Sequence, residues 1–320
     1  MQTEVSMSRS LKKLLGLLLT LLSISLVVFI IMNVIPGDPA ITILGIESTP
    51  EARAVLRDKL GLNDPAWQRY VNWLLGAFHG DFGVSYSFGV PVSELVAERL
   101  PLTLTLALVA TVLTIVGALA LGAIAAMNHG NWIDRLLSMT SQIGVAVPVF
   151  WLAMILVIVF AVQLRWVPPG GFPGWSHPVA GAKALILPAC SLALVQTAIL
   201  ARVTRAAILE VARLDYVRTA RSMGLNRRQI MLYHILPNAM VPIVTVAGLQ
   251  FASLITGTIV IENVFYLPGL GRLMIQSIGN RDLITVQALV VLFAVMVVLT
   301  NFVVDVFYAW IDPRMKEGRT

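Results

Sequence analysis

The chain has 320 residues, of which 58% are hydrophobic and only 12% are charged. A soluble globular domain carries about 25% charged residues, so this composition excludes an ordinary water-soluble fold. The formal net charge of +6 would suggest nucleic acid binding in a soluble protein. In a membrane protein, basic residues instead gather in cytoplasmic loops, and we expect no nucleic acid partner. Cys190 is the single cysteine, which excludes an intrachain disulfide framework.

Six stretches are apolar over about 20 residues, the length that a helix needs to cross the hydrocarbon core of a bilayer. They lie near Leu14–Ile35, Leu102–Met127, Leu137–Leu164, Ala184–Leu200, Ala239–Ile261 and Ile284–Tyr308. Pro188, Gln196 and Thr197 interrupt the fourth stretch, but six remains the best count. The first stretch is too long for the apolar core of a signal peptide, so we expect it to be retained. The sequence therefore predicts an all-α, polytopic membrane protein.

The distribution of basic residues predicts the orientation of these helices. Segments 1–13, 128–136, 202–238 and 310–320 hold fourteen of the 23 Lys and Arg residues, and the three opposite loops, which are longer in total, hold nine. By the positive-inside rule, both termini and the 202–238 loop face the cytoplasm. The expected organisation is a first helix within 1–35, an extracytoplasmic segment 36–101, a transmembrane core 102–309 and a cytoplasmic tail 310–320.

The segment 36–101 is expected to form a small helical cap outside the membrane. Two parts of it, Pro50–Leu60 and Ala66–Phe78, have helix-like sequences. In the second part, apolar residues recur at three- and four-residue spacings and give a helix one apolar face. These residues are Trp67, Tyr70, Trp73, Leu74 and Phe78. We expect this face to pack on the membrane helices or to lie at the interface, where aromatic residues are favoured.

Several catalytic classes lack their motifs in this sequence. No Gly-x-x-x-x-Gly-Lys-Ser/Thr loop is present, so the chain has no phosphate-binding loop of its own and cannot power transport alone. The four histidines lie far apart, with no His-x-x-x-His pair that would favour a zinc site, and no Gly-x-Ser-x-Gly elbow is present. We expect no catalytic residues, no metal and no cofactor. An ion-coupled secondary transporter stays open as a distant alternative, although buried carboxylates are scarce.

Polar residues within the apolar stretches are candidates for a transport pathway. On the fifth stretch Gln250, Ser253 and Gly257 share one helical face, and further candidates are Ser141, Gln142 and Gln196. The competing interpretation is helix packing, since small and hydroxyl residues let transmembrane helices approach and bond. The outer segment 165–183 contains Pro168-Pro-Gly-Gly-Phe-Pro-Gly-Trp, which is too rich in helix breakers for regular structure and is either a gate or a packed turn.

The 202–238 loop contains a short segment that can form a helix. Arg213–Met223 lacks Gly and Pro, and Gly224 followed by Asn226 is expected to end this helix as a C-cap. Without further information, a basic cytoplasmic loop is most often only a determinant of topology.

The same loop resembles the coupling motif of binding-protein-dependent ABC importers, written Glu-Ala-Ala, three residues, Gly, nine residues, Ile, one residue, Leu-Pro. In register, Ala220, Gly224, Leu236 and Pro237 match, whereas Arg218, Thr219 and His234 occupy the Glu, first Ala and Ile positions. The form Asp215-Tyr-Val-Arg-Thr-Ala-Arg is similar to that of dipeptide, oligopeptide, nickel and glutathione permeases. Further fragments resemble the first permease of that group, the DppB/OppB type. They are Pro36-Gly-Asp-Pro-Ala, Leu60-Gly-Leu, Gly80-Asp-Phe-Gly-Val-Ser, Glu98-Arg-Leu-Pro, Glu262-Asn-Val-Phe, Pro268-Gly-Leu-Gly-Arg and Asn280-Arg-Asp.

This resemblance implies a six-helix permease of the type I importer fold in the bacterial inner membrane, which carries short peptides or, alternatively, nickel complexes or glutathione. It implies three kinds of partner besides lipid: a second homologous permease, two ATP-binding subunits and an extracytoplasmic binding protein. It also implies that the loop helix sits in a groove of the ATPase subunit, where small Ala220 permits close approach and Gly224 permits the turn. The residues assigned to this contact are Asp215, Tyr216, Arg218, Thr219, Ala220, Arg221, Gly224, Leu225, Leu236 and Pro237.

Overall fold

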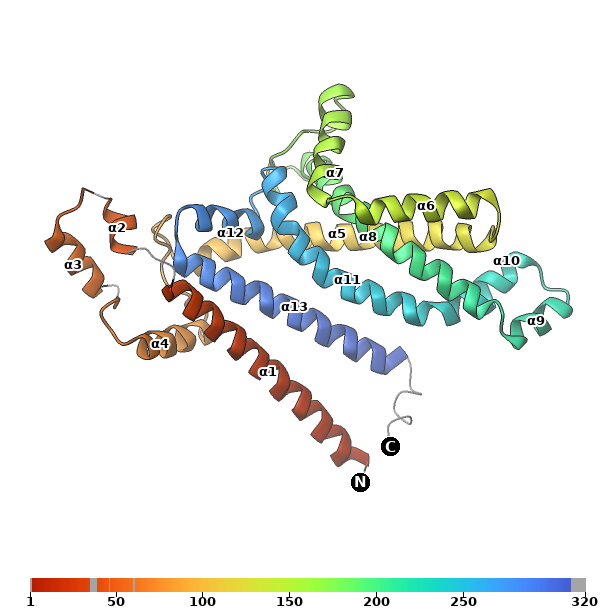
Figure 1. Ribbon diagram of the computed structural model, residues 1–320, viewed down its shortest axis with the longest axis horizontal. Helices are drawn as coiled ribbons and strands as arrows, with labels where there is room; N and C mark the ends of the chain where they lie inside the picture. The colour runs from red at the N-terminus through yellow and green to blue at the C-terminus, as the bar shows by residue number, and fades with distance from the viewer. Residues whose placement is uncertain (1, 35–38, 46, 60, 312–320) are drawn as a thin grey trace. The chain divides into compact units, whose positions relative to one another are not determined.

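The computed structural model describes residues 2–34, 39–45, 47–59 and 61–311. Its helices are α1 (Gln2–Val34), α2 (Pro39–Leu44), α3 (Pro50–Lys59), α4 (Ala66–Phe78), α5 (Val92–Met127), α6 (Trp132–Ala146), α7 (Val149–Leu156), η1 (Val157–Gln163), α8 (Pro178–Val211), α9 (Asp215–Ser222), α10 (Arg227–Gln229), η2 (Ile230–Ile235), α11 (Leu236–Val264), α12 (Leu270–Gly279) and α13 (Leu283–Ile311) (Figure 1). These described residues contain no strand, only one isolated bridge between Val84 and Pro91. The all-α prediction is confirmed. Part of the fragment at Pro36 and most of the expected tail 310–320 lie outside the described residues.

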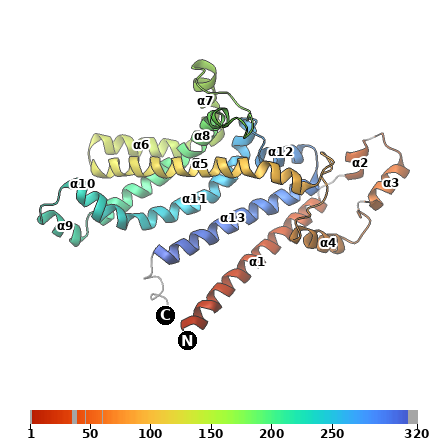
Figure 2. The same cartoon turned by 180° about the vertical axis from the view of Figure 1, so that it is seen from behind.

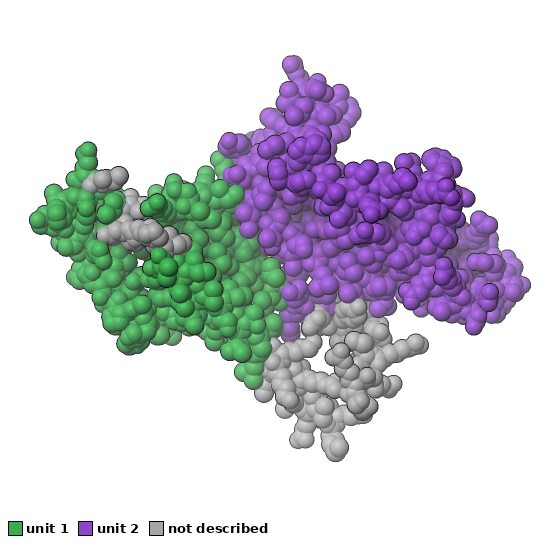
Figure 3. Space-filling view, viewed as in Figure 1, with its two compact units in different colours: residues 1–102, 268–298 green, residues 103–267, 299–320 purple. Residues whose placement is uncertain are grey.

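The chain divides into two compact units, which Figure 3 colours separately. Unit 1 comprises residues 1–102 and 268–298, and unit 2 comprises residues 103–267 and 299–320. The helices α5 and α13 each contribute to both units. Each unit is described by itself below.

In unit 1, α4 packs on α1 through the aromatic face that the sequence predicts. The hydroxyls of Ser25 and Tyr70 lie 2.8 Å apart, and the rings of Phe29 and Tyr70 are 5.2 Å apart between centroids. Tyr70, Trp73 and Leu74 are half-buried, whereas Trp67 and Phe78 are 70% and 69% exposed. The predicted packing therefore holds for Tyr70, Trp73 and Leu74, whereas Trp67 and Phe78 extend beyond the contact.

In unit 2, α5, α6, α8 and α11 run alongside one another in both views (Figures 1 and 2). Small residues allow this close packing. A Cβ added at Gly122 would lie 2.5 Å from Cβ of Thr204, and one added at Gly144 would lie 2.9 Å from Cβ of Ala198. Because neither clash has room to relax without moving a helix, these glycines fix α5 and α6 directly against α8.

Five predicted spans correspond to helices that are long and apolar enough to cross a membrane. They are Leu15–Val34, Val92–Met127, Pro178–Val211, Arg227–Val264 and Leu283–Val304. The fourth span is continuous although Pro188 lies inside it, and it extends well beyond the predicted Ala184–Leu200 at both ends. Proline inside a membrane helix is tolerated where neighbouring helices, side chains or local adjustments satisfy the carbonyl that it leaves without a donor.

The third predicted span, Leu137–Leu164, is wrong as a single helix. The structure divides it into α6 and the α7–η1 pair, which are bent by 106° relative to each other. The break falls at Val147, whose φ of −84° and ψ of 124° are extended. Pro148 follows it, and a residue before proline is driven out of the helical region by the proline ring. Up to six spans result if this bent pair counts as one.

The breaker-rich segment before α8 is irregular, as predicted, and is packed against the end of α11. The Gly171 N–H donates to the Phe265 carbonyl at 2.7 Å, and a Cβ added at Gly170 would lie 2.5 Å from the same oxygen. Phe172 and Trp175 meet edge to face, with ring centroids 5.0 Å apart. These contacts favour the packed-turn interpretation of this segment.

Candidate functional site

The helix α9 lies beyond the end of α8 in both ribbon views and is fixed by two buried side chains (Figures 1 and 2). Val217 is fully buried and Ala220 is 5% exposed. Both belong to an apolar cluster to which α8 contributes Ile208 and η2 contributes Ile230 and Ile235. Because positions three apart lie on one side of a helix, these two residues give α9 a narrow apolar base. We call residues 212–238 the coupling loop.

Gly224 lies in the turn that follows α9 and has a left-handed backbone conformation. Its φ is +85°, and a Cβ added there would meet no atom within 4 Å. The Gly224 N–H donates to the Arg221 carbonyl at 3.1 Å, and the Leu225 N–H donates to the Ala220 carbonyl at 3.4 Å. The positive φ, rather than a lack of space, therefore demands glycine here, because side chains with a Cβ are strained in this conformation.

Asn226 does not cap the end of α9, in contrast to the sequence prediction. It starts α10 instead: the Gln229 N–H donates to Asn226 Oδ1 at 2.8 Å, and the Asn226 N–H donates to Gln229 Oε1 at 3.1 Å. This reciprocal arrangement is a capping box, which satisfies N–H groups at the start of a helix. Arg227 and Arg228 therefore lie on a new helical turn rather than in an extended tail of α9.

The predicted coupling residues fall into an exposed group and an anchoring group. Asp215, Tyr216, Arg218, Thr219, Arg221 and Gly224 are exposed, as is Pro237 at the start of α11. Leu225 and Leu236 are half-buried and pack against the apolar cluster. Ala220 belongs with them: it is 5% exposed, and its small size lets α9 approach its own chain. That it also permits close approach of a partner stays a prediction.

Electrostatic contacts within the exposed group are weak. Arg218 and Asp215 are 3.8 Å apart, and their side chains are 77% and 98% exposed. Exposed ion pairs contribute little because water screens them. The Tyr216 hydroxyl donates to the His234 carbonyl at 3.3 Å. The charged side chains of α9 are thus accessible for contacts outside this chain.

The predicted pathway residues separate into two environments. Gln250 is 6% exposed, and its amide nitrogen donates to the Gln196 carbonyl on α8 at 3.2 Å. Ser141 is half-buried on the face of α6 that carries Gly144 and packs on α8. Gln142 and Ser253 are exposed. Gln250 and Ser141 are thus packed toward α8, although Gln250 Oε1 is buried without a hydrogen-bond partner among the described residues and the contact uses only the main chain of Gln196. Gln142 and Ser253 are accessible polar groups.

Unit 1 contains a buried carboxylate that sequence reasoning missed. Asp282 is fully buried and accepts hydrogen bonds from the Ser85 hydroxyl and from the N–H groups of Tyr86 and Ser87, the latter two at 3.2 and 3.3 Å. It also accepts the Thr285 hydroxyl at 2.8 Å, at the start of α13. In the sequence, the fragments that begin at Gly80 and Asn280 are two separate motifs. Their chain separation of nearly two hundred residues gives no local signal that they meet.

Unit 2 contains a second buried carboxylate, Asp134, which is 4% exposed. Arg205 on α8 donates to it through Nε at 2.5 Å and through Nη2 at 2.7 Å. This pair was also missed, because an acidic residue in the first turn of a helix is common and its partner lies 71 positions away.

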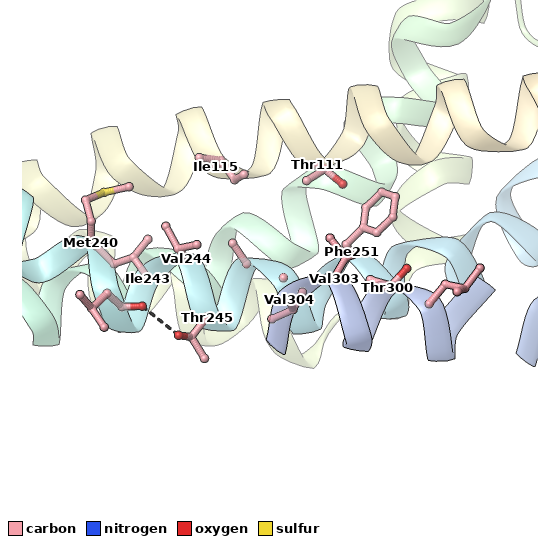
Figure 4. Close-up of a pocket in the computed structure, with 14 residues that line it drawn as sticks. Thr111, Ile115, Met240, Ile243, Val244, Thr245, Phe251, Thr300, Val303 and Val304 are labelled. Carbon is pink, nitrogen blue, oxygen red and sulfur yellow. Dashed lines mark hydrogen bonds between the residues drawn. The ribbon is translucent and has the colours of Figure 1, made fainter. Parts of the chain in front are cut away.

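A pocket of about 450 Å³ lies between α5, α11 and the end of α13 in unit 2 (Figure 4). Its lining is apolar apart from threonine hydroxyls. Those of Thr111 and Thr245 donate to the Ala107 and Val241 carbonyls of their own helices, at 2.7 and 2.8 Å. The oxygens of these hydroxyls can still accept hydrogen bonds, but the rest of the lining is apolar, so the pocket is suited to hydrocarbon rather than to the many amides of a peptide.

The sequence matches two family patterns over most of its length. The pattern described as "Binding-protein-dependent transport system inner membrane component" matches residues 118–317, and the corresponding N-terminal pattern matches residues 7–107. The chain belongs to this family. It is a permease subunit of an ABC importer and a multi-pass protein of the inner membrane. This membership replaces the ion-coupled secondary transporter that the sequence left open.

Individual relatives agree with the family. A protein of Brucella abortus (strain 2308) named "Putative peptide transport system permease protein" is 42% identical over 92% of this chain and 95% of its own length. The glutathione transport system permease protein GsiC of Escherichia coli (strain K12) is 40% identical over 95% of this chain and 97% of its own length. Among solved structures, an inward-facing MetNI methionine ABC transporter aligns with a TM-score of 0.57 at 21% identity. That alignment covers 68% of this chain and 96% of the other, which shows a shared permease fold.

Proposed function

We propose that this permease imports short peptides and that ATP is hydrolysed in partner subunits. The Brucella relative named as a peptide permease supports the substrate class, because the alignment covers nearly the whole of both chains. The absence of a phosphate-binding loop from the sequence supports the division of labour. Purified alone, the chain should hydrolyse no ATP. Turnover that persists after contaminating ATPases are removed would contradict this assignment.

The observation that carries the coupling assignment is the shape of α9. Its charged residues are exposed, while Val217 and Ala220 hold it on a buried apolar base at the end of α8. A rigidly mounted helix with free polar groups can seat in a groove of another subunit and transmit displacement to the helix behind it. We assign this contact to the ATPase, with Asp215, Tyr216, Arg218 and Arg221 facing it.

For orientation, we propose that both termini and the coupling loop are cytoplasmic and that residues 36–101 form an outer cap. The basic asymmetry of the sequence supports this arrangement. A topology reporter fused after Gly80 should be located outside, and one fused after Gly318 should be located inside. Two reporters on the same side would contradict the proposal.

For the pathway, we propose a polar stripe on α6 that consists of Arg135, Ser138 and Gln142. All three are exposed, and their spacing of three and four residues places them on one side of the helix. A glutamine facing hydrocarbon leaves its amide unsatisfied at a cost of several kcal/mol, so this side of α6 requires a polar neighbour. Ser253 on α11 is a further exposed candidate. A second permease subunit would complete the pathway.

The decisive experiment is uptake into liposomes that contain this chain, a second permease and two ATPase subunits, with an extracytoplasmic binding protein outside. ATP-dependent accumulation of a labelled dipeptide or oligopeptide is expected. Glutathione is the second candidate, because GsiC is similar over nearly the same length. Competition with unlabelled glutathione and with a nickel chelate distinguishes these solutes. Accumulation of glutathione or nickel without peptide would contradict the peptide assignment while leaving the importer assignment intact.

A further inference from the structure

A two-pronged ion pair lies at the turn between α5 and α6. Arg205 presents two nitrogens to the two carboxylate oxygens of Asp134, at 2.5 and 2.7 Å. The Gly130 N–H donates to the same carboxylate at 3.0 Å. His129 Nδ1 lies 3.1 Å from Asp134 Oδ2 and 3.0 Å from Arg205 Nη2. Such a two-pronged contact fixes distance and orientation together, which a single point contact does not.

The pair joins the elements that the proposed function requires to move together. Asp134 is in the first turn of α6, one turn before Ser138 and two turns before Gln142, on the helix that carries the polar stripe. Arg205 lies six residues before α8 ends at Val211, and α9 begins shortly afterwards at Asp215. Displacement of α9 therefore reaches Arg205 through a short length of rigid helix.

Stability alone does not explain a charged pair at this position. The Asp134 side chain is 6% exposed, so its carboxylate loses most of its hydration, whereas the Arg205 side chain stays 26% exposed. Well-packed apolar replacements of buried ion pairs are often neutral or stabilising. Elsewhere along the same interface the contact is made by small neutral residues, such as Gly144 against Ala198. What the ion pair adds is a contact that resists sliding and rotation of α6 against α8, because its fork-shaped geometry allows one arrangement.

We propose that Asp134 and Arg205 are positioning residues that transmit the displacement of α9 to α6 and thereby couple ATP hydrolysis to opening of the pathway. This inference rests on the proposed import function and names the residues that carry the mechanical connection. In this role both residues act through the helices that they join.

The test replaces both charges with apolar side chains, Asp134→Leu together with Arg205→Met, in the full importer complex. Removing both partners avoids an isolated buried charge, so membrane abundance and ATPase association should stay near wild type. Solute imported per ATP hydrolysed should fall about fivefold or more, the range of typical coupling effects. The matched control is Glu98→Leu together with Arg99→Met, an ion pair at 3.5 Å in unit 1, which should leave this ratio unchanged.

A double variant that folds and imports the wild-type amount of solute per ATP would overturn the proposal and reduce the pair to a packing element. If that variant does not accumulate in the membrane, Arg205→Lys tests the proposal instead. Lysine keeps the positive charge but cannot make the two-pronged contact with Asp134. A lower ratio at normal abundance would support the proposal, and an unchanged ratio would overturn it. Absence of ATP-dependent uptake by the wild-type complex would instead contradict the proposed function, so the two failures are distinguishable.

Discussion

The coupling loop and the segments around Asp282 differ in which residues are buried. The coupling loop joins two membrane helices, the segments around Asp282 precede the membrane helices α5 and α13, and both regions contain several polar residues. In the coupling loop, apolar Val217 and Ala220 are buried and the charged residues are exposed. Around Asp282, by contrast, a carboxylate is buried, and Ser85, the chain at Tyr86 and Thr285 donate hydrogen bonds to it. We call residues 80–91 and 280–285 the Asp282 loop.

This difference indicates what the polar residues of each loop do. In the coupling loop the charged side chains of Asp215, Arg218 and Arg221 are exposed, and the Arg218–Asp215 ion pair at 3.8 Å is weak, so these charges are available for contact with another molecule. Around Asp282 they donate hydrogen bonds to a buried carboxylate, and loss of the Ser85 or Thr285 bond leaves a buried hydroxyl unsatisfied. The same residue types are therefore a contact surface in one loop and the internal scaffold in the other.

The largest expected effect is that of Asp282→Ala. The substitution leaves the Ser85 and Thr285 hydroxyls and the N–H groups of the Asp282 loop without their acceptor, and we expect a loss of about 3 kcal/mol or more in stability. Thermal unfolding in detergent and membrane abundance measure it. Asp81→Ala is the control, because Asp81 is an exposed carboxylate of the same loop that accepts only the Gly83 N–H in the structure described. Equal losses of stability from the two substitutions would contradict the proposal that buried Asp282 holds these segments together.

Ala220→Leu tests whether the base of α9 is internal. The added carbons meet the apolar cluster, so the purified chain should lose about 1–3 kcal/mol in stability before any partner is present. Thr219→Leu, one position away on the exposed side, should leave stability within about 0.5 kcal/mol. A stable Ala220→Leu chain that fails only to bind the ATPase would favour the partner-facing interpretation instead.

Gly224→Val tests the turn after α9. At φ +85° a β-branched side chain is strained by about 1–3 kcal/mol, which displaces the end of α9 and should lower ATPase association and uptake at near-normal abundance. Gly45→Val is the matched control, since Gly45 has a φ of +84° and open space around it but lies between α2 and α3. Normal uptake by Gly224→Val at normal abundance would exclude this turn from the coupling interface.

The smallest effect concerns Tyr86 in the Asp282 loop. Burial raises the pKa of Tyr86 to about 12, Arg69 opposes this shift, and the Asp282 charge adds to it. Because the folded chain favours the neutral phenol, this contribution to stability is complete below pH ~10 and is lost as pH rises through about 12. The difference in phenolate absorbance between wild type and Tyr86→Phe, recorded after rapid mixing, gives the pKa of Tyr86. Asp282→Asn should lower that pKa, and an unchanged value would show that the carboxylate charge does not act on Tyr86.

The membrane helices were predictable because their signal is local. A run of about 20 apolar residues is sufficient for a helix in lipid, where the backbone must satisfy itself. The same reasoning failed at the third span, since hydropathy does not register the effect of Pro148 on the conformation of Val147. It also underestimated the fourth span, because the tertiary environment tolerates Pro188.

The sequence by itself determined the all-α membrane class, the helix-forming coupling loop and the need for glycine at position 224, because each depends on composition, spacing or backbone conformation within a few residues. Only the tertiary structure decided which polar residues are buried. Asp134 meets Arg205, and Asp282 meets Ser85, across 71 and 197 positions. Ala220 likewise is recognised as an internal anchor only when the cluster around Ile208 is known. Pairings between distant residues arise from how helices pack, and neither hydropathy nor periodicity records which faces meet.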